Sequence, residues 1–332
     1  MTNTNPTFSI SVVIPNYNGK HLLEANIPSV LEALSFIKAE NEIIVVDDAS
    51  TDSSVEFMKQ HYPNIQLIVN ASNQGFSPTI NKGIFAAQHQ LVLCLNSDVQ
   101  LSADYFIHQL KYFEKTDTFG VIGKIIDQTD KHLQDAGKYP KMSFKGIKGS
   151  YNYIPKSLPT EIWLPTFFLS GANALIDRKK LMELGGFNEL FAPFYFEDAD
   201  LGVRAWRIGY KCYFEPQAVC MHALSSTIKK LQSEKVKTII ERNRILFNYL
   251  HLEGFTLKLF KCWLFMRCYS RLIIGNSTIY NAIKSVRNKE KELEKSQRAL
   301  EELQKKHNKY YSVKNIESTI YKSIEGIAYQ IF

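Results

Sequence analysis

The sequence lacks the patterns that mark several common protein classes. None of its five cysteines belongs to a C-x-x-C pair, and their odd number argues against a disulfide or zinc framework, so we expect reduced thiols. The first ten residues, MTNTNPTFSI, contain no basic stretch followed by an apolar one, so we do not expect a secretory signal. No uninterrupted apolar run reaches the length of a membrane span. Together these absences predict a cytoplasmic protein.

Two enzyme classes are disfavoured by missing loops. A dinucleotide oxidoreductase would carry G-x-G-x-x-G after an early strand, and no such motif occurs. A sugar-nucleotide pyrophosphorylase needs a glycine-rich, basic loop after its first strand, which IPNYNGKHL does not supply. The formal net charge of +7 is concentrated late in the chain. It permits attraction to phosphates or to an anionic membrane, but we do not expect a nucleic-acid partner.

The first third of the 332 residues repeats a strand followed by a helix. Apolar strand-like segments lie at 11–15, 42–46, 65–69 and 91–95, and helical patterns lie at about 20–38, 52–61, 77–89 and from about 103. The run at 42–46 has no polar alternation, which is typical of a strand buried on both faces. We therefore predict an α/β fold with a mostly parallel, Rossmann-like sheet flanked by helices.

The middle of the chain changes character. Glycines and prolines break residues 119–165 into short apolar pieces, which predicts irregular strands and long loops. The following segments predict a strand (ANALI), two helices (RKKLMELG and EDADLGVRAWRIG) and strands near 211–215 and 218–222. Beyond residue 226 the sequence predicts basic and charged helices.

Carboxylates and amides follow the ends of two predicted strands. Asp47 and Asp48 come after the second strand, and Asn96, Ser97 and Asp98 come after the fourth. Ligands in open α/β sheets bind beyond the carboxyl ends of the strands, and Mg²⁺ and Mn²⁺ prefer oxygen ligands. The alternative for Asp47 and Asp48 is a helix cap or a turn.

Two loops have the composition of ligand-binding turns. One contains Pro15, Asn16 and Tyr17 after the first strand, where proline ends the strand. The other surrounds a helix start with Asn73, Gly75 and Asn81, and a helix N-terminus entered through glycine is a natural phosphate site. An ordinary turn and an ordinary helix cap remain the alternatives.

Three acids lie in four residues at the start of a predicted helix, in EDADL. The aromatic residues at 194–196 would partly desolvate Glu197 or Asp198, and a carboxylate with a raised pKa suits a general base. The alternative is capping of the helix with an ion pair between Asp200 and Arg204. His222 ends an apolar strand, where a histidine is either a hydrogen-bonded core residue or a ligand.

Taken in order, these motifs resemble an inverting family 2 glycosyltransferase of the GT-A fold, in the rhamnosyltransferase-like branch that builds bacterial surface polysaccharides. The resemblance covers about residues 9–250. It rests on these stretches: VVIPNYNG, IIVVDDASTDSS, NQGFSPTINKG, LVLCLNSDV, FFLSGANALIDR, GGFNELFAPFYFEDADLGVRAWRIG and MHALSST.

The resemblance implies a role for each motif. Asp47 would face the nucleobase, Asp98 would bind a divalent cation, Mn²⁺ or Mg²⁺, at the diphosphate, with His222 as a further ligand, and Asp198 would be the base. Gly171 and Ala172 would leave room for the donor sugar. Many members of the fold carry Asp-x-Asp at the metal site, whereas this chain has Asn96 in the first position. The predicted catalytic residues are Asp198 and Glu197, and the predicted nucleotide-binding residues are Pro15, Asn16, Tyr17, Asp47, Asp48, Asn73, Gly75, Asn81, Asn96 and Ser97.

These expectations divide the chain into a catalytic domain, 1–225, and a helical C-terminal extension, 226–332. Within the domain, a half at about 1–118 would bind the nucleoside-diphosphate sugar, and a half at about 119–225 would bind the acceptor, a glycan or a lipid-linked molecule. Cations among apolar residues at 255–273 predict either an interfacial helix at the inner face of the cytoplasmic membrane or a helix packed on the catalytic domain. The rival to an enzyme is an inactive GT-A scaffold that binds a glycan or a protein.

Overall fold

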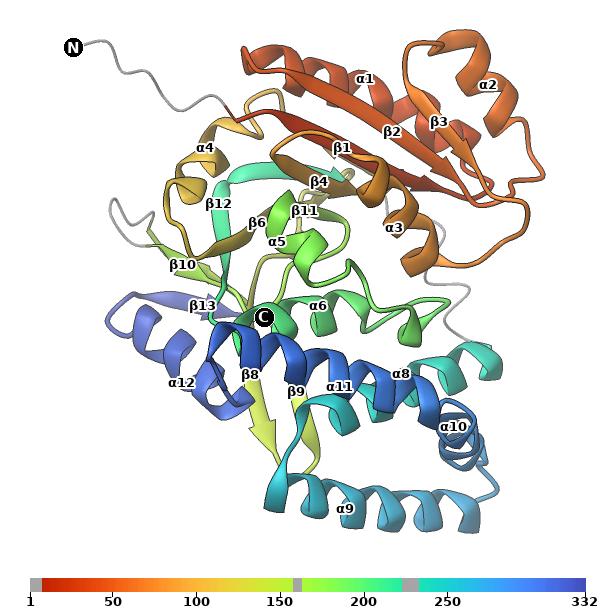
Figure 1. Ribbon diagram of the computed structural model, residues 1–332, viewed down its shortest axis with the longest axis vertical. Coiled ribbons are helices and arrows are strands. Elements are labelled where there is room, and N and C mark those ends of the chain that lie inside the picture. The colour runs from red at the N-terminus through yellow and green to blue at the C-terminus, as the bar shows by residue number, and fades with distance from the viewer. Residues whose placement is uncertain (1–7, 158–162, 223–232) are drawn as a thin grey trace.

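The computed structural model describes residues 8–157, 163–222 and 233–332. Within these ranges, the chain forms a 10-stranded mixed sheet flanked by helices and a separate 3-stranded sheet (Figure 1). The N-terminal elements are β1 (Ile10–Asn16), α1 (Lys20–Phe36), β2 (Asn41–Asp47), α2 (Ser54–His61), β3 (Gln66–Val69), α3 (Phe76–Ala86) and β4 (Leu91–Leu95). They confirm the predicted alternation and the α/β class.

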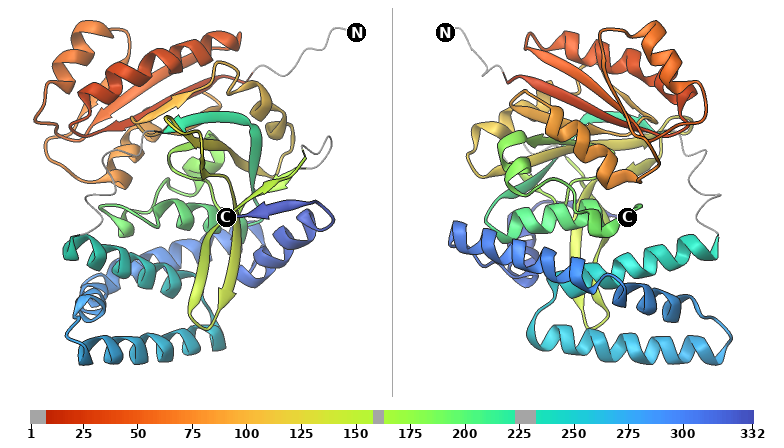
Figure 2. Two further views of the ribbon diagram at one scale, coloured as in Figure 1. Left: turned by 180° about the vertical axis from the view of Figure 1, so that it is seen from behind. Right: turned by 45° about the vertical axis from the view of Figure 1, so that its right-hand side comes forward.

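The N-terminal strands form the parallel part of the sheet. β1 pairs in parallel with β2 and with β4, and β2 pairs in parallel with β3. The apolar run of β2 is buried on both faces, because helices cover the sheet on either side (Figure 2). The parallel arrangement brings the ends of β1, β2 and β4 to one edge, where the polar motifs begin.

The next elements extend the sheet with mixed directions. They are β5 (Val99–Leu101), α4 (Ile107–Leu110), β6 (Thr118–Asp127), β7 (Leu133–Asp135), β8 (Gly137–Ser143), β9 (Gly146–Pro155), β10 (Leu164–Pro165), β11 (Asn173–Asp177), α5 (Arg178–Glu183), α6 (Glu197–Arg207) and β12 (Lys211–His222). The strand order is β10-β12-β6-β11-β4-β1-β2-β3. β11 runs antiparallel to both β4 and β6, so the sheet is mixed rather than parallel throughout.

Two sequence boundaries differ in the structure. The strands expected at 211–215 and 218–222 form one strand, β12, with a register shift between Glu215 and Val219. The helix expected from about 103 begins only at Ile107 and continues after four residues as a short 3-10 helix.

The C-terminal part is mainly helical. It comprises α8 (Glu234–His251), α9 (Gly254–Ile273), α10 (Thr278–Arg287), α11 (Glu290–His307), α12 (Val313–Ile324) and β13 (Tyr329–Ile331). β13 pairs antiparallel with β9 and completes the 3-stranded sheet β13-β9-β8. The domain boundary predicted near residue 225 lies outside the described residues.

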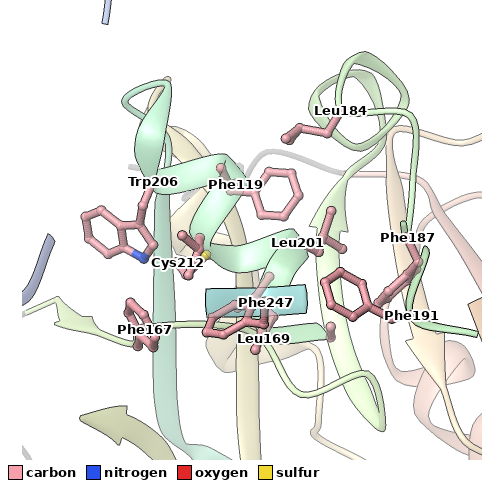
Figure 3. Close-up of a cluster of buried hydrophobic side chains, with 14 of the residues drawn as sticks. Phe119, Phe167, Leu169, Leu184, Phe187, Phe191, Leu201, Trp206, Cys212 and Phe247 are labelled. Carbon is pink, nitrogen blue, oxygen red and sulfur yellow. The ribbon is translucent and has the colours of Figure 1, made fainter. Parts of the chain in front are cut away.

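One apolar core joins the large sheet to the C-terminal helices. Leu201 and Trp206 of α6 meet Phe167 and Leu169 of the preceding segment and Phe247 of α8 in a buried cluster (Figure 3). α6 is therefore fixed from both sides, which holds its acidic N-terminus in place. Among the described helices, none combines the length and the apolar character needed to cross a bilayer.

Candidate active site

Asp98 and His222 meet at the edge of the sheet although they are far apart in the sequence. β5 pairs antiparallel with β12, and this register sets His222 opposite Val99. Nε2 of His222 lies 3.0 Å from Oδ2 of Asp98. Oδ1 of Asp98 is buried and has no hydrogen-bond partner among the described residues. The structure thus brings the two predicted metal ligands together and leaves one carboxylate oxygen free to bind.

The surroundings of His222 fit a metal ligand. Oε1 of Gln134 accepts a hydrogen bond of 2.8 Å from Nδ1 of His222, so Nε2 is the nitrogen that faces Asp98. Two donors bound about 2.1 Å from one octahedral ion lie about 3 Å apart, which matches the observed separation. The hydrogen bond to Asp98 raises the pKa of His222, against the effect of burial. The donor set therefore fits a divalent cation such as Mn²⁺ or Mg²⁺.

A second group of potential ligands lies next to this pair. Donor atoms of Asp127, Asp130 and His132 all lie within 4.8 Å of one another. Nε2 of Gln134 donates a hydrogen bond of 2.7 Å to Oδ2 of Asp127, so one glutamine connects this group to His222. Asp130 and His132 are exposed, whereas Asp98 and His222 are mostly buried.

Asp47 lies at the expected edge, but its carboxylate is occupied within the turn. Oδ2 accepts hydrogen bonds from Nδ2 of Asn16 at 2.9 Å and from Oγ of Ser50 at 2.6 Å, and Oδ1 accepts from the Ser50 amide at 2.8 Å. Asp47 is 1% exposed. These bonds join the ends of β1 and β2, and a contact between Asp47 and a nucleobase stays a prediction. Tyr17, two residues after the partly exposed Pro15, is itself exposed and open to a ligand.

Asp48 holds the loop that enters α3. Its carboxylate accepts the backbone amides of Gln74, at 2.9 and 3.1 Å, and of Gly75, at 2.9 Å. Gly75 has a φ of +88°, and a Cβ there would lie 2.7 Å from Cα of Pro193, so only glycine fits. The amide of Phe76 donates to the Pro193 carbonyl at 2.8 Å. Asp48 therefore couples this loop to the segment before Glu197.

Asn81 lies in the structure beside Phe187. Its side chain is buried and exchanges two hydrogen bonds of 2.8 Å with the backbone of Phe187, and a contact between Asn81 and a nucleotide stays a prediction. Asn73, by contrast, is exposed at the loop where it was expected.

Gly171 and Ala172 lie between the metal pair and the acids of α6. A Cβ built on Gly171 would lie 3.2 Å from the Phe76 ring and 3.9 Å from Cβ of Asp198. The carbonyl of Ala172 accepts the Asn96 amide at 3.1 Å, and Ser97 and Asp98 follow directly. This segment connects three of the predicted motifs, and a larger residue at Gly171 would crowd both neighbours.

Glu197 and Asp198 begin α6 in an environment that opposes their ionisation. Burial raises the pKa of Asp198, and the positive charge of Lys138 partly offsets this effect. Burial and the neighbouring Asp198 raise the pKa of Glu197 well above its usual range. Oε2 of Glu197 is buried and has no partner among the described residues. A carboxylate held in this way is suited to accept a proton.

The alternative of capping and ion pairing holds for Asp200 alone. Its carboxylate contacts Nε of Arg204 at 2.7 Å and Nε2 of His251 at 2.9 Å, and all three residues are buried. Arg204 also donates to the carbonyls of Leu184 and Gly186. The third acid of EDADL is thus structural, which leaves the first two for chemistry.

Sequence reasoning missed residues that shape the site from a distance. Asn243 of α8 is fully buried, and its Nδ2 donates to the carbonyls of Phe191, Phe194 and Tyr195. Tyr195 and Phe196 have φ values of +71° and +76°, so the turn before Glu197 is strained. A single asparagine in a helical pattern carries no sequence signal for this role.

Lys138 of β8 was also missed. Burial lowers its pKa to about 8, while Asp198 acts in the opposite direction. Its Nζ contacts Asp135 and donates to Oδ1 of Asn152 at 2.9 Å. A lysine in an irregular, basic segment gives no indication in the sequence that it is buried.

Comparisons with known proteins show the family of the chain. A model described as glycosyl transferase family 2 matches residues 11–185. The chain belongs to glycosyl transferase family 2. It is 24% identical over 204 residues to the N-acetylglucosaminyl-diphospho-decaprenol L-rhamnosyltransferase of Mycobacterium tuberculosis, covering 54% of this chain and 66% of that one. It is 25% identical over 233 residues to the poly-beta-1,6-N-acetyl-D-glucosamine synthase of Staphylococcus epidermidis, covering 69% of this chain and 53% of that one. The chain thus spans between half and two thirds of the length of these relatives.

Solved structures show the same fold. GalNAc-T7 with UDP, GalNAc and Mn²⁺ superposes with a TM-score of 0.66 at 16% identity, covering 97% of this chain and 58% of that one. A mannosyltransferase of Pyrobaculum calidifontis in complex with GDP-Man and Mn²⁺ gives a TM-score of 0.52 at 14% identity, covering 96% of this chain and 86% of that one. At these identities the likeness shows the fold alone. It confirms the GT-A fold predicted from the sequence, and the family confirms a glycosyltransferase.

Proposed function

We propose that this glycosyltransferase depends on a divalent metal and inverts the anomeric centre. In this proposal it moves a sugar from a nucleoside-diphosphate sugar to a hydroxyl of a glycan or lipid-linked acceptor, in bacterial surface polysaccharide synthesis. The relatives named above include a rhamnosyltransferase and a polysaccharide synthase, which supports this class of product. The observation that carries the proposal is the pairing of Asp98 with His222, joined through Ala172 and Gly171 to Asp198.

Asp98 and His222 would hold the cation, with Gln134 keeping the imidazole in the ligating tautomer. The bound cation would supply positive charge to the diphosphate leaving group, whose negative charge grows as the glycosidic bond breaks. Asn96 stands where many relatives of this fold carry a further acid, so this chain would offer the cation one carboxylate fewer.

Asp198 would take the proton from the acceptor hydroxyl as that oxygen attacks the anomeric carbon from the face opposite the diphosphate. Its raised pKa makes it a stronger base than an exposed aspartate. Glu197, beside it, would keep the pocket poor in water and supply a second acid. Gly171 and Ala172 would border the donor sugar, because they lie beside Asp198 and neither carries a side chain larger than a methyl group.

The nucleotide pocket would lie between the ends of β1 and β2 and the loop that begins α3. Its border residues are Pro15, Asn16, Tyr17, Asp47, Asp48, Asn73, Gly75, Asn96 and Ser97. In this pocket Asp48 accepts backbone amides of the loop that begins α3, Asn16 donates to the Asp47 carboxylate, and the exposed Tyr17 would contact the ligand. A catalytic domain over 1–225 with an acceptor half at 119–225 fits this division of roles.

A panel of nucleoside-diphosphate sugars with Mn²⁺ tests the proposal. The wild-type protein should release one nucleoside diphosphate, and Asp98→Asn and Asp198→Asn should each abolish release at unchanged circular dichroism. Product configuration, read by NMR coupling constants, should be opposite to that of the donor. Tight binding of a nucleotide with no turnover of any donor would favour the inactive scaffold instead.

The Mycobacterium relative is named for an acceptor linked through diphosphate to decaprenol. We propose an acceptor of this general class, a glycan on a lipid diphosphate, for the present chain. A cytoplasmic enzyme acting on such a molecule would work at the inner face of the cytoplasmic membrane.

A further inference from the structure

One face of α9 is apolar and uncovered. Six of its residues recur at spacings of four and three, which places them on one side of a helix. This outer face consists of Phe255, Leu259, Cys262, Met266, Tyr269 and Ile273, all of them exposed. Phe255 is 73% exposed and Ile273 is 69% exposed. Side chains of this size are rarely left open in a row without a partner.

The opposite face of α9 is packed, so the exposure does not come from a loose helix. Phe260 and Leu264 are buried, and the Phe260 ring lies against Tyr249 of α8. Arg267 forms two hydrogen bonds of 2.8 Å with Glu241 of α8. α9 is therefore fixed to the molecule by one face and presents the other outward.

The charge around this face has one sign. Between Glu253 and Glu290 the chain contains no acidic residue. It contains seven cations in that interval: Lys258, Lys261, Arg267, Arg271, Lys284, Arg287 and Lys289. Lys258 and Lys261 are exposed and lie on one flank of the outer face. A surface that is apolar along its centre and basic at its flank is complementary to anionic lipid.

The tip of the β8–β9 hairpin lies beside α9 (Figures 1 and 2). The Ile147 amide donates to Oδ1 of Asn248 at 2.8 Å, and a Cβ on Gly146 would lie 3.0 Å from the Phe260 ring. At the tip, Phe144 is 52% exposed, next to the exposed Lys145. The hairpin thus adds a second apolar and basic element to the same end of the molecule.

Like charges face each other in this hairpin. Lys141 lies directly opposite Lys148 in the antiparallel pair, and both are exposed. Such a pair is unfavourable in isolation because the two charges repel. An external surface of negative charge would offset that repulsion.

We propose that the outer face of α9 and the tip of the β8–β9 hairpin together bind an anionic phospholipid bilayer. The aromatic and aliphatic side chains enter the headgroup boundary, and the lysines contact lipid phosphates. A second copy of the chain fits less well, because a symmetric contact through this face would set its lysines against each other. This inference deepens the membrane location that rests on the proposed function, and it is tested without the transfer reaction.

Vesicle flotation measures the binding directly. The full chain is mixed with vesicles of phosphatidylcholine alone or with about one third phosphatidylglycerol, at low and high salt. We expect flotation with the anionic vesicles, with loss at high salt because screening weakens charge attraction. The double variant Phe255→Ser/Ile273→Ser should bind at least about tenfold more weakly, since each of these side chains would bury a large apolar surface in the bilayer.

Matched variants at the opposite end of the molecule serve as controls. Phe36→Ser, at the exposed end of α1, and Lys38→Glu should float like the wild type. Lys145→Glu should reduce binding to anionic vesicles and leave binding to neutral vesicles unchanged. All variants should release nucleoside diphosphate from the donor at the wild-type rate, so a failure here is separable from a failure of the transferase proposal.

Two results would overturn the inference. One is equal flotation by the wild type and the Phe255/Ile273 double variant, because the outer face would then not contact lipid. The other is a wild-type dimer in sedimentation velocity that the double variant converts to a monomer, since this would assign the face to a second copy.

Discussion

Replacing Asn243 with alanine should separate catalysis from stability at this site. Asn243 lies on α8, outside the parts of the chain that carry the acids, and its hydrogen bonds go to neither Asp98 nor Asp198. Its Nδ2 reaches three carbonyls of the turn, at 2.6, 2.9 and 2.9 Å. The variant removes these donors and leaves the carbonyls buried.

The expected magnitude follows from the bonds. The two amide hydrogens of Asn243 serve three carbonyls and its Oδ1 accepts from Nε of Arg242, so the variant loses about three hydrogen bonds, worth about 3 to 5 kcal/mol when buried partners are left unsatisfied. A chain of this size should remain folded after such a loss. The turn, however, carries two left-handed residues, each costing about 1 to 3 kcal/mol, and should relax once its restraint is gone.

A relaxed turn would displace Asp198, and a displacement near 1 Å costs about 100-fold in rate. We therefore expect kcat to fall about 100-fold and the KM of the donor to rise much less, because Asp47 and Asp48 still hold the nucleotide loops and the Phe76–Pro193 bond links them to the turn. Steady-state release of nucleoside diphosphate measures both constants.

Asn248→Ala is the matched control. Asn248 is the same residue type on the same helix, is equally buried, and loses two bonds, to the Ile147 amide and the Arg244 carbonyl. Its melting temperature should fall by a similar amount, but kcat should stay near the wild-type value. Equal kcat losses in both variants would refute the positioning role, since general destabilisation would then explain the effect.

Three further predictions concern the acids and the cation. Asp98→Asn should remove most of the Mn²⁺-dependent thermal stabilisation by a nucleoside diphosphate, whereas His132→Ala should keep it; the reverse order in a thermal-shift assay would move the metal to the exposed cluster. Lys138→Met should shift the acidic limb of the kcat/KM profile to higher pH, because the positive charge of Lys138 holds the pKa of Asp198 down and its loss lets that pKa rise; an unmoved limb would remove Asp198 as the base or Lys138 as its neighbour. Glu197→Gln should raise the melting temperature more at pH 8 than at pH 5, because a buried carboxyl with a raised folded pKa costs the protein stability as the pH rises. An equal effect of the substitution at both pH values would contradict the burial of the charge.

The early strands were predictable because burial on two faces leaves a direct trace in the sequence. β2 reads as an unbroken apolar run, and its bounds agree with the expected 42–46 to within one residue at each end. The reversed direction of β11 has no such trace, because the same apolar letters suit either direction once both neighbours bury them.

β12 shows a different limit. Glu215, Pro216 and Gln217 interrupt its apolar pattern, and proline normally argues against a continuous strand. In the structure the strand continues through these residues, and its pairing with β6 shifts register there. Glu215 is buried and forms an ion pair with Lys111. A tertiary ion pair between distant residues cannot be seen in local sequence.

The candidate site was predictable where chemistry follows a strand end. Asp98 and His222 were expected together from the family resemblance, and the structure pairs them. The hydrogen bond from Asn81 to the Phe187 carbonyl was not predictable, because the same residues in the sequence suit a phosphate loop and a packing contact. The role of Asn243 could not be predicted from the sequence, because it depends on three carbonyls some fifty residues earlier in the chain.

The β8–β9 hairpin also sets the distance between the candidate active site and the tip of the hairpin. Lys138, whose charge acts on Asp198, lies near the start of β8, and Ser143 lies at its other end beside the tip. At about 3.3 Å per residue the five steps from Lys138 to Ser143 span about 17 Å, which would separate the proposed base from the surface that the tip is proposed to contact. The enzyme would then select acceptors by the distance between the lipid and the acceptor hydroxyl. Removing two residues from each strand shortens this distance by about 7 Å, and the shortened protein should prefer acceptors with fewer sugars between lipid and hydroxyl.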